Sequence, residues 1–202
     1  MQDNRYDVIV VGAGFAGLAC ARELASGGFR VCVVGRKHDL GGRLHTTGIL
    51  VKEAGESPLL AGLPAALVRA VPHIRLYAPN LRSVRLGAKD YRYYPTDTPA
   101  LMRWMGEQAR AAGIDLRLGW AFRDAVRAAN GWHVPGIGHA RFLVGADGAR
   151  SRVAERMGLG RARQFLYGVE HEFDGVALRG PDAAGPGAFL REELGLATLR
   201  AA

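Results

Sequence analysis

The sequence is poor in cysteine and aromatic residues and has no long hydrophobic run. Its 202 residues include two cysteines and 8% aromatic residues. Cys20 and Cys32 have neither metal-ligand spacing nor the density of a disulfide scaffold, so we expect a reducing, cytoplasmic environment and no metal site. No stretch approaches the ~18 apolar residues of a membrane span, and the first residues lack the charged-then-apolar pattern of a signal peptide. We therefore expect no transmembrane segment.

Acidic residues are also scarce, since 19 Asp and Glu stand against 27 Lys and Arg, which gives a net charge of +8. Such a balance can indicate a nucleic-acid partner. The arginines are scattered, however, with only short groups such as Arg36-Lys37 and Arg161-Ala162-Arg163. Surfaces that bind a phosphate backbone are usually denser and interleaved with aromatic residues. We therefore expect a small-molecule substrate and no nucleic-acid partner, and the oligomeric state stays open.

The N-terminal part of the sequence has the pattern of a strand, a helix and a second strand. Residues 6–11 form a continuous apolar run rich in β-branched side chains, which is typical of a parallel strand buried on both faces. Apolar residues then recur at helical spacing from Leu18 to Ala25, and Gly27-Gly28 ends that helix. Residues 29–34 predict a second buried strand. Together they form a βαβ unit, which must be right-handed.

The middle of the chain is less regular. Residues 41–56 bear several glycines and indicate a functional loop. Ser57-Pro58 is a helix-start signal, and we expect a helix from there that reaches Val71. Between residues 73 and 94, three segments alternate polar and apolar side chains, which predicts an inserted antiparallel sheet. Its strands are expected at 73–77, 83–86 and 91–94.

The pattern becomes regular again after residue 95. Asp97 is the predicted N-cap of a helix that ends at Gly113. The elements expected after it are a strand at 114–118, a hairpin through Asn130-Gly131, a buried strand at 141–145 and a short helix at 151–157.

These patterns predict an α/β fold: a Rossmann-like FAD/NAD(P)-binding domain with a central parallel sheet and helices, plus a small inserted antiparallel β segment at about 73–94. We place the domain at residues 1–174. Residues 175–202 are rich in turn signals, and we interpret them as an irregular tail that begins a missing substrate domain.

The turn between the first strand and its helix has the pattern Gly12-x-Gly14-x-x-Gly17. The first glycine permits a tight turn, the second lets the backbone approach a pyrophosphate, and the third allows close packing of the helix on the strand. The N-terminus of the helix then presents free amides and the positive end of its dipole to the phosphates. The sequence therefore predicts a dinucleotide-binding site at this turn.

The acidic residue that usually binds the adenosine ribose is missing at the end of the second strand. Gly35 occupies that position, Arg36 and Lys37 follow, and the nearest acid is Asp39. Two interpretations stay open. Either backbone groups or water hold the ribose, or Arg36 binds a 2′-phosphate, which would make the ligand NADP.

Two motifs resemble those of FAD-dependent oxidoreductases of the geranylgeranyl reductase and aromatic-ring hydroxylase superfamily. The first is the strand and turn at 7–18, where Phe15 replaces a common proline. The second is Gly145–Val153, in which Asp147 and Gly148 match a family motif near the FAD and the nicotinamide donor. The resemblance implies FAD as cofactor and NAD(P)H as reductant. It also implies reduction or hydroxylation of an organic substrate, such as an isoprenoid or an aromatic compound.

The same resemblance implies further site residues. Gly41-Gly42-Arg43 is similar to the loop beside the FAD pyrophosphate, and Arg43 and Arg150 could offset phosphate charge. No side chain is assigned as catalytic, because a lone histidine such as His45 is more often structural or on the surface, and Asp147 is interpreted as a ligand-positioning group. The predicted cofactor-binding residues are Gly12, Ala13, Gly14, Phe15, Ala16, Gly17, Gly35, Arg36, Gly42, Arg43, Asp147 and Gly148.

The sequence also departs from the superfamily. Reductase relatives have a cysteine in the stretch that corresponds to 45–50, and complete relatives have a third FAD motif, Gly-Asp-Ala-x-Gly; neither is found here, since Pro181–Gly185 is only superficially similar. Two alternatives to an active flavoenzyme therefore stay open. One is an NADP-binding module, which Gly35-Arg36-Lys37 favours, and the other is an inactive, truncated flavoprotein remnant.

Overall fold

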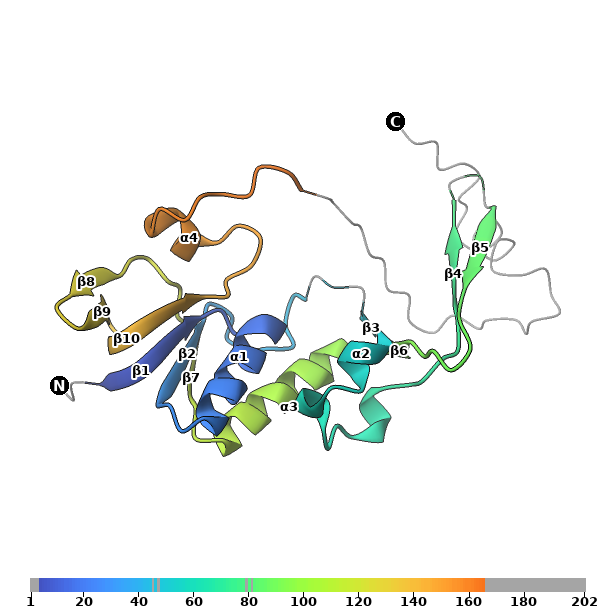
Figure 1. Ribbon diagram of the computed structural model, residues 1–202, viewed down its shortest axis with the longest axis horizontal. Coiled ribbons are helices and arrows are strands. Elements are labelled where there is room, and N and C mark those ends of the chain that lie inside the picture. The colour runs from blue at the N-terminus through green and yellow to red at the C-terminus, as the bar shows by residue number, and fades with distance from the viewer. Residues whose placement is uncertain (1–3, 45, 47, 79, 81, 166–202) are drawn as a thin grey trace.

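The structure is a computed structural model that describes residues 4–44, 46, 48–78, 80 and 82–165. The strands of its main sheet are β1 (Arg5–Val11), β2 (Val31–Gly35), β7 (Asp115–Leu118), β8 (Val126–Ala128), β9 (Gly131–Val134) and β10 (Gly138–Gly145). They lie in the order β7-β2-β1-β10-β9-β8 (Figure 1). The first four strands in that order are parallel, and β10, β9 and β8 are antiparallel. The predicted α/β Rossmann-like fold is confirmed.

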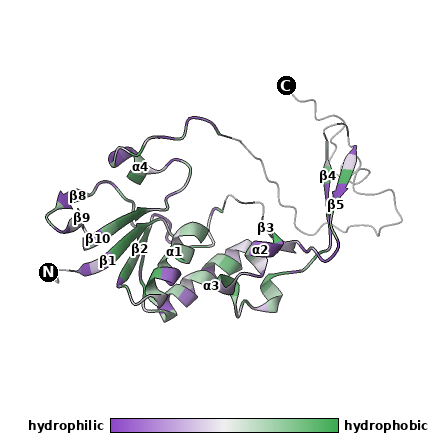
Figure 2. Cartoon of the chain, in the orientation of Figure 1, coloured by the Kyte–Doolittle hydropathy of each residue, from purple (hydrophilic) through white to green (hydrophobic). Residues whose placement is uncertain are grey.

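The two inner strands of the parallel part, β2 and β1, are apolar because both of their faces are covered. Val8–Val11 and all of β2 are buried, and Figure 2 shows this part of the sheet in the hydrophobic colour. Helices α1 (Phe15–Ser26) and α3 (Thr98–Ala111) cover one face. The other face packs against Phe122 and against Val153 of the short helix α4 (Arg152–Arg156).

Helix α3 begins and ends where the sequence predicts. The Asp97 side chain accepts a hydrogen bond from the Ala100 amide at 3.0 Å, which satisfies a backbone donor of the first turn. Gly113, just beyond the helix, has a φ of +78°, a conformation that glycine adopts without steric cost. Leu101 and Met105 are buried on the inner face of the helix.

The prediction of a helix from Ser57 to Val71 is wrong. Two separate turns of 3₁₀-helix stand in its place, η1 (Pro58–Leu60) and η2 (Ala65–Leu67). Gly62 between them has a φ of +79°, and Pro64 cannot donate the backbone hydrogen bond that a continuous helix needs. The expected loop at 41–56 also contains a short strand, β3 (Ile49–Leu50), and one helical turn, α2 (Lys52–Gly55).

The inserted segment forms a hairpin of two strands rather than a sheet of three. Strands β4 (Ile74–Tyr77) and β5 (Ser83–Leu86) pair with each other, as the alternation predicts, and the hairpin projects away from the main sheet (Figure 1). The expected third strand at 91–94 is wrong. Strand β6 (Tyr94–Pro95) pairs with β3 instead, and Tyr93 makes an isolated bridge with Val71.

Strand β10 is less buried than the sequence predicts. Phe142 lies opposite the buried Val8 of β1, yet its side chain is 54% exposed. The two residues share the sheet face that carries α1 and α3. Since α1 packs on β1 and β2, and α3 packs on β7, β10 lies at the flank of that layer. The apolar run therefore predicted the strand correctly, but it did not predict how much of the strand is exposed.

A polar cluster joins β1 and β7 across the strand that lies between them, β2. The Tyr6 hydroxyl donates to Asp115 at 2.5 Å, and the Arg117 guanidinium donates to Tyr6 at 2.8 Å and to Asp115 at 2.9 Å. Burial raises the pKa of the adjacent Cys32 thiol to about 12, so the thiol stays protonated at neutral pH. Burial also acts to raise the pKa of Asp115, but the hydrogen bonds from Arg117 and Tyr6 outweigh it and leave this pKa below its ordinary value.

Substitution of Asp115 by Asn should change how stability depends on acid. Because the pKa of Asp115 is lower in the folded protein than in the unfolded chain, its contribution is complete above the unfolded pKa and is lost as the pH falls through the folded pKa. We expect the free energy of unfolding of the wild type to fall more steeply below about pH 4 than that of Asp115→Asn. Urea unfolding over a series of pH values measures this. Glu107→Gln, at an exposed position of α3, is the control, and equal slopes for wild type and Asp115→Asn would contradict the prediction.

Candidate functional site

The glycine turn lies at the carboxyl end of β1, between that strand and α1. Gly12 has a φ of +118°, and its amide donates to the Val34 carbonyl of β2 at 2.8 Å. A Cβ at Gly12 would collide with the backbone of Ala146, and a Cβ at Gly17 would collide with the Gly12 carbonyl. The first and third glycines are therefore required by close packing within the fold itself.

Gly14 differs from the other two glycines because space is open around it. It is the N-cap of α1 with a φ of −88°, it makes no side-chain cap, and the first turn of α1 has no acidic residue. A Cβ at Gly14 would meet nothing within 4 Å. In contrast, Asp97 caps α3 and Ser151 caps α4 through their side chains. The start of α1 is therefore an uncapped helix N-terminus with open space in front of it, as anion binding requires.

The second motif lies beside the glycine turn. Strands β1 and β10 are parallel neighbours with Val11 opposite Gly145, and the Ala146 amide donates to the Val11 carbonyl at 2.7 Å. A Cβ at Gly12 would come within 2.9 Å of the Asp147 amide nitrogen. The two motifs, far apart in the sequence, thus meet at the carboxyl edge of the sheet, where α/β folds bind their ligands.

The carboxylate of Asp147 is directed to the start of α4. Its oxygens accept hydrogen bonds from the Ser151 hydroxyl at 2.5 Å, the Arg152 amide at 2.7 Å and the Val153 amide at 3.3 Å. Gly148 follows with a φ of +88°. The backbone of this motif, rather than the Asp147 side chain, therefore faces the glycine turn.

The end of β2 also faces the glycine turn but carries no acid. Gly35 is buried, and a Cβ there would come within 2.7 Å of the Ala13 Cβ. Arg36 is exposed. The Lys37 ammonium donates to the Arg43 carbonyl at 2.8 Å, and burial together with the positive charge of Arg36 lowers the pKa of Lys37.

The nearest acid, Asp39, is already paired. Arg103 of α3 donates to both of its carboxylate oxygens, at 3.0 and 2.7 Å. These hydrogen bonds, with one from the Gly41 amide, lower the pKa of Asp39. The sequence pattern did not indicate this pair, because its partners lie 64 residues apart. Arg36 and Lys37 form no ion pair with another described residue, so the end of β2 keeps their positive charge within this part of the chain.

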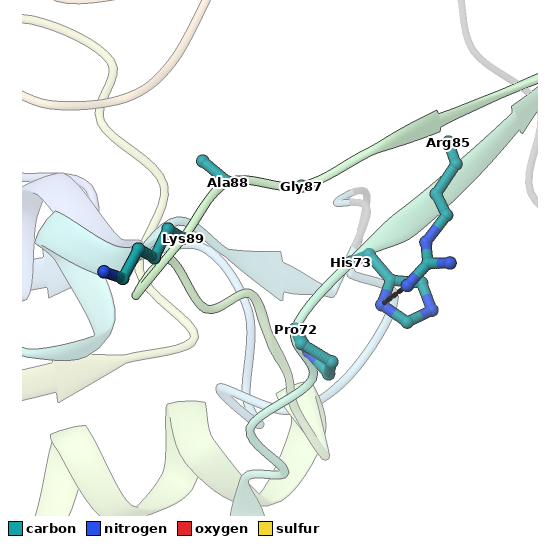
Figure 3. Close-up of a pocket in the computed structure, with 6 residues that line it drawn as sticks. All are labelled: Pro72, His73, Arg85, Gly87, Ala88 and Lys89. Atoms are coloured by element: carbon teal, nitrogen blue, oxygen red, sulfur yellow. Dashed lines mark hydrogen bonds between the residues drawn. The ribbon is translucent and has the colours of Figure 1, made fainter.

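Four other residues that the sequence analysis considered, Gly42, Arg43, His45 and Arg150, lie outside the contact between the two motifs or outside the described residues. Arg43 is exposed and has a φ of +48°, Gly42 is half-buried beside Asp39, and His45 lies outside the described residues. The Arg150 guanidinium lies 5.6 Å from the ring centroid of Phe165. One pocket lies at the base of the β4–β5 hairpin and contains none of the predicted cofactor-binding residues (Figure 3). It is lined by Pro72, His73, Arg85, Gly87, Ala88 and Lys89.

The fold is that of an α/β Rossmann-like domain. The family model of the NAD(P)-binding Rossmann-like domain matches residues 10–71. The chain is 32% identical over 182 residues to the probable electron transfer flavoprotein-quinone oxidoreductase YgcN of Escherichia coli K12, covering 79% of this chain and 39% of that protein. It is 29% identical over 171 residues to the digeranylgeranylglycerophospholipid reductase of Methanothrix thermoacetophila, covering 78% of this chain and 43% of that protein.

A solved structure shares the fold. PqsL, a probable FAD-dependent monooxygenase from Pseudomonas aeruginosa, matches with a TM-score of 0.61 at 21% identity, over 81% of this chain and 48% of that one. Over most of its length this chain is therefore similar in sequence to the reductase and to the probable quinone oxidoreductase, and it has the fold of the probable monooxygenase. It spans less than half the length of the three proteins named here.

Two further findings concern the described residues alone. None of their helices is long and apolar enough to cross a membrane. Within the same residues, no group of three or more His, Cys, Asp and Glu side chains is arranged to hold a metal ion.

Loss of the Asp147 carboxylate should loosen α4. Asp147→Ala removes the acceptor of two backbone amides and one hydroxyl, and loss of such a cap costs about 1 kcal/mol. Asp147→Asn keeps one acceptor oxygen, so we expect a smaller cost. Urea unfolding gives the free energies, and amide hydrogen exchange locates the change at residues 152–157. Unchanged exchange there in Asp147→Ala would show that the carboxylate has another role.

Proposed function

We propose that this chain binds FAD, with the FAD pyrophosphate at the Gly12–Gly17 turn, as the nucleotide-binding part of a flavin-dependent oxidoreductase. The observation that supports this most is the contact between the two motifs, because Gly12 packs directly on the backbone of Ala146 and Asp147. The glycine turn alone would suit any adenine dinucleotide. The second motif packs against this turn, and the same fold occurs in a probable FAD-dependent monooxygenase. Together these favour FAD.

The residues at the turn fit a pyrophosphate. The uncapped start of α1 offers backbone amides and the positive end of the helix dipole, and the open space at Gly14 lets phosphate oxygens approach them. The Asp147-Gly148 backbone and the Gly42-Arg43 loop would border the bound cofactor from β10 and from beyond β2. The Asp147 carboxylate would act as a positioning group, since it holds α4 and thereby fixes this backbone.

The bound flavin would supply hydride or oxygen chemistry after reduction by NAD(P)H. The relatives include a reductase, a quinone oxidoreductase and a probable monooxygenase, so we propose reduction or hydroxylation of an organic substrate, isoprenoid or aromatic. This chain's described residues would bind and orient the cofactor, and we assign none of them as catalytic. We further propose residues 1–174 as the nucleotide-binding domain, with 175–202 leading into a substrate-binding part.

We also propose a cytoplasmic location. Among the described residues, Cys20 and Cys32 are free thiols, and Cys32 is buried in β2. Unpaired cysteines inside a folded domain are typical of a reducing compartment.

Gly14→Ala tests the FAD proposal without disturbing the fold. The new methyl group has open space around it and an ordinary φ, so we expect unchanged or slightly higher stability. The methyl group would occupy the space in front of the amides, and we expect the dissociation constant for FAD to rise at least about tenfold. Quenching of flavin fluorescence on titration measures the affinity, and the visible spectrum of the purified protein shows bound flavin.

Gly27→Ala is the matched control. Gly27 lies at the other end of α1 with a φ of −78°, and a Cβ there would come no closer than 3.4 Å to another atom. This variant should bind FAD like the wild type. A folded Gly14→Ala protein with wild-type FAD affinity would contradict the proposed position of the pyrophosphate. A wild-type protein that binds no FAD would contradict the proposal itself.

A second candidate is an NADP-binding module, and the end of β2 favours it. FAD has no 2′-phosphate on its adenosine ribose, whereas NADP carries one, and arginine commonly binds this group. Arg36 and Lys37 supply positive charge there, and the nearest carboxylate, on Asp39, is held by Arg103. Burial and the positive charge of Arg36 lower the pKa of Lys37, and a 2′-phosphate would offset the effect of that charge.

Calorimetric titration with 2′,5′-ADP and with 5′-ADP distinguishes the two candidates. If the module binds NADP, 2′,5′-ADP should bind at least about tenfold more tightly than 5′-ADP, and Arg36→Ala should remove that preference. Arg30→Ala is the control, because Arg30 is an exposed arginine at the opposite end of β2. Equal affinity of the wild type for both nucleotides would contradict the NADP candidate and leave the FAD proposal untouched.

A further inference from the structure

One face of α3 packs against the loop that follows β2. Pro99, Arg103 and Gly106 are separated by four and three residues, so they lie on the same face of this helix. A Cβ at Gly106 would collide with the Leu40 Cδ1 atom, and Leu40 is buried. Glycine inside a helix normally lowers its stability. Here it leaves the space into which the Leu40 side chain packs.

Arg103 joins this helix face to the loop through a carboxylate. Its guanidinium donates to both carboxylate oxygens of Asp39, at 3.0 and 2.7 Å, which is the bidentate geometry that arginine forms with a carboxylate. The same carboxylate accepts from the Gly41 amide at 3.1 Å. A Cβ at Gly41 would come within 2.7 Å of the guanidinium carbon of Arg103. The guanidinium therefore lies directly on the backbone of the loop.

The loop holds Arg43 in a conformation that residues with a side chain rarely adopt. The Gly42 amide donates to the Asp39 carbonyl at 3.2 Å, which closes a turn. Arg43 then has a φ of +48°, and such a conformation persists only where the surroundings enforce it. From the end of β2, the Lys37 ammonium donates to the Arg43 carbonyl at 2.8 Å. The position of Arg43 is therefore set by contacts at both ends of the loop.

We propose that Arg103 is a positioning residue for the cofactor: it holds Asp39, and through the backbone of residues 39–43 it fixes Arg43 beside the FAD pyrophosphate. The inference rests on the proposed function, in which this loop borders the cofactor. Arg103 acts through the loop and does not touch FAD. Groups that contact a ligand need such support from the residues behind them, because an unsupported loop samples other conformations.

The opposite charges of the pair distinguish positioning from simple electrostatic attraction. FAD is an anion, so if only net charge mattered, loss of Arg103 would weaken its binding and loss of Asp39 would strengthen it. If the pair positions the loop, either loss releases the same backbone, and both should weaken binding. Two substitutions that change the charge in opposite directions are thus expected to change the affinity in the same direction.

Titration of flavin fluorescence with the whole 202-residue chain tests this expectation. Arg103→Met and Asp39→Ala should each raise the dissociation constant for FAD at least about tenfold. Arg103→Lys keeps the charge but lacks the planar fork, so it should retain only part of the affinity. Arg110→Met is the matched control and should bind FAD like the wild type. Arg110 is another exposed arginine of α3, and it forms no ion pair with a described carboxylate.

A double-mutant cycle shows whether Arg103 acts through Arg43. In an Arg43→Ala background, Arg103→Met should change the dissociation constant for FAD by less than about twofold, because the side chain that it positions is gone. In the protein without FAD, Arg103→Met should speed amide hydrogen exchange in residues 40–43. Exchange in β1 should stay as in the wild type, which shows that the variant is folded.

Each of four results would overturn the proposal. Tighter binding of FAD by Asp39→Ala would show that charge alone matters. Wild-type affinity in Arg103→Met would remove the positioning role and leave the proposed function intact. Equal losses of affinity with and without the Arg43 side chain would show that Arg103 supports the fold as a whole. A wild-type protein that binds no FAD would contradict the proposed function and this inference with it.

Discussion

The structure depends on the close approach of two backbone segments, the glycine turn after β1 and the end of β10. Gly12 lies against the Ala146 carbonyl so closely that no Cβ fits between them, and the Ala146 amide completes the contact by donating to Val11. This contact places the start of α1 and the start of α4 at the same edge of the sheet. A side chain at position 12 would separate β1 from β10, and the two motifs would no longer border one site.

Two helix starts at this edge are satisfied in different ways. Asp147 and Ser151 cap α4 internally, through side chains of the chain itself. The start of α1 has no such cap, so an external anion would be its natural partner. The same carboxyl edge carries Arg36 and Lys37, while the negative charge of Asp39 is offset by Arg103. The edge is therefore suited to anions at two places, the helix start and the end of β2.

The part of the chain between β2 and α3 is less compact than the main sheet and its helices. Its elements are short, and the β4–β5 hairpin exposes apolar side chains that the main sheet does not cover. The relatives named above extend well beyond the length that this chain matches.

Much of the sheet and the glycine turn could be predicted because their signals are local. The apolar runs of β1 and β2, the spacing of Gly12, Gly14 and Gly17, and the Asp97 cap each depend on neighbours within a few residues. The prediction of one helix at 57–71 was wrong because Gly62 and Pro64 interrupt the helix. The spacing of the leucines on which that prediction rested takes no account of these two residues. The prediction of a third hairpin strand at 91–94 was wrong because the alternation of polar and apolar residues does not determine which strand a segment pairs with. Strand β6 pairs with β3 instead.

The sequence alone thus determined the βαβ unit, its glycine turn and the absence of an acid after β2, because these are properties of consecutive residues. Only the tertiary structure decided that the Asp147 carboxylate caps α4, that Arg103 holds Asp39, and that Phe142 is exposed at the flank of the helical layer. Each of these depends on which distant segments become neighbours. The packing of the whole sheet determines which segments become neighbours, and a pattern of consecutive residues does not contain this information.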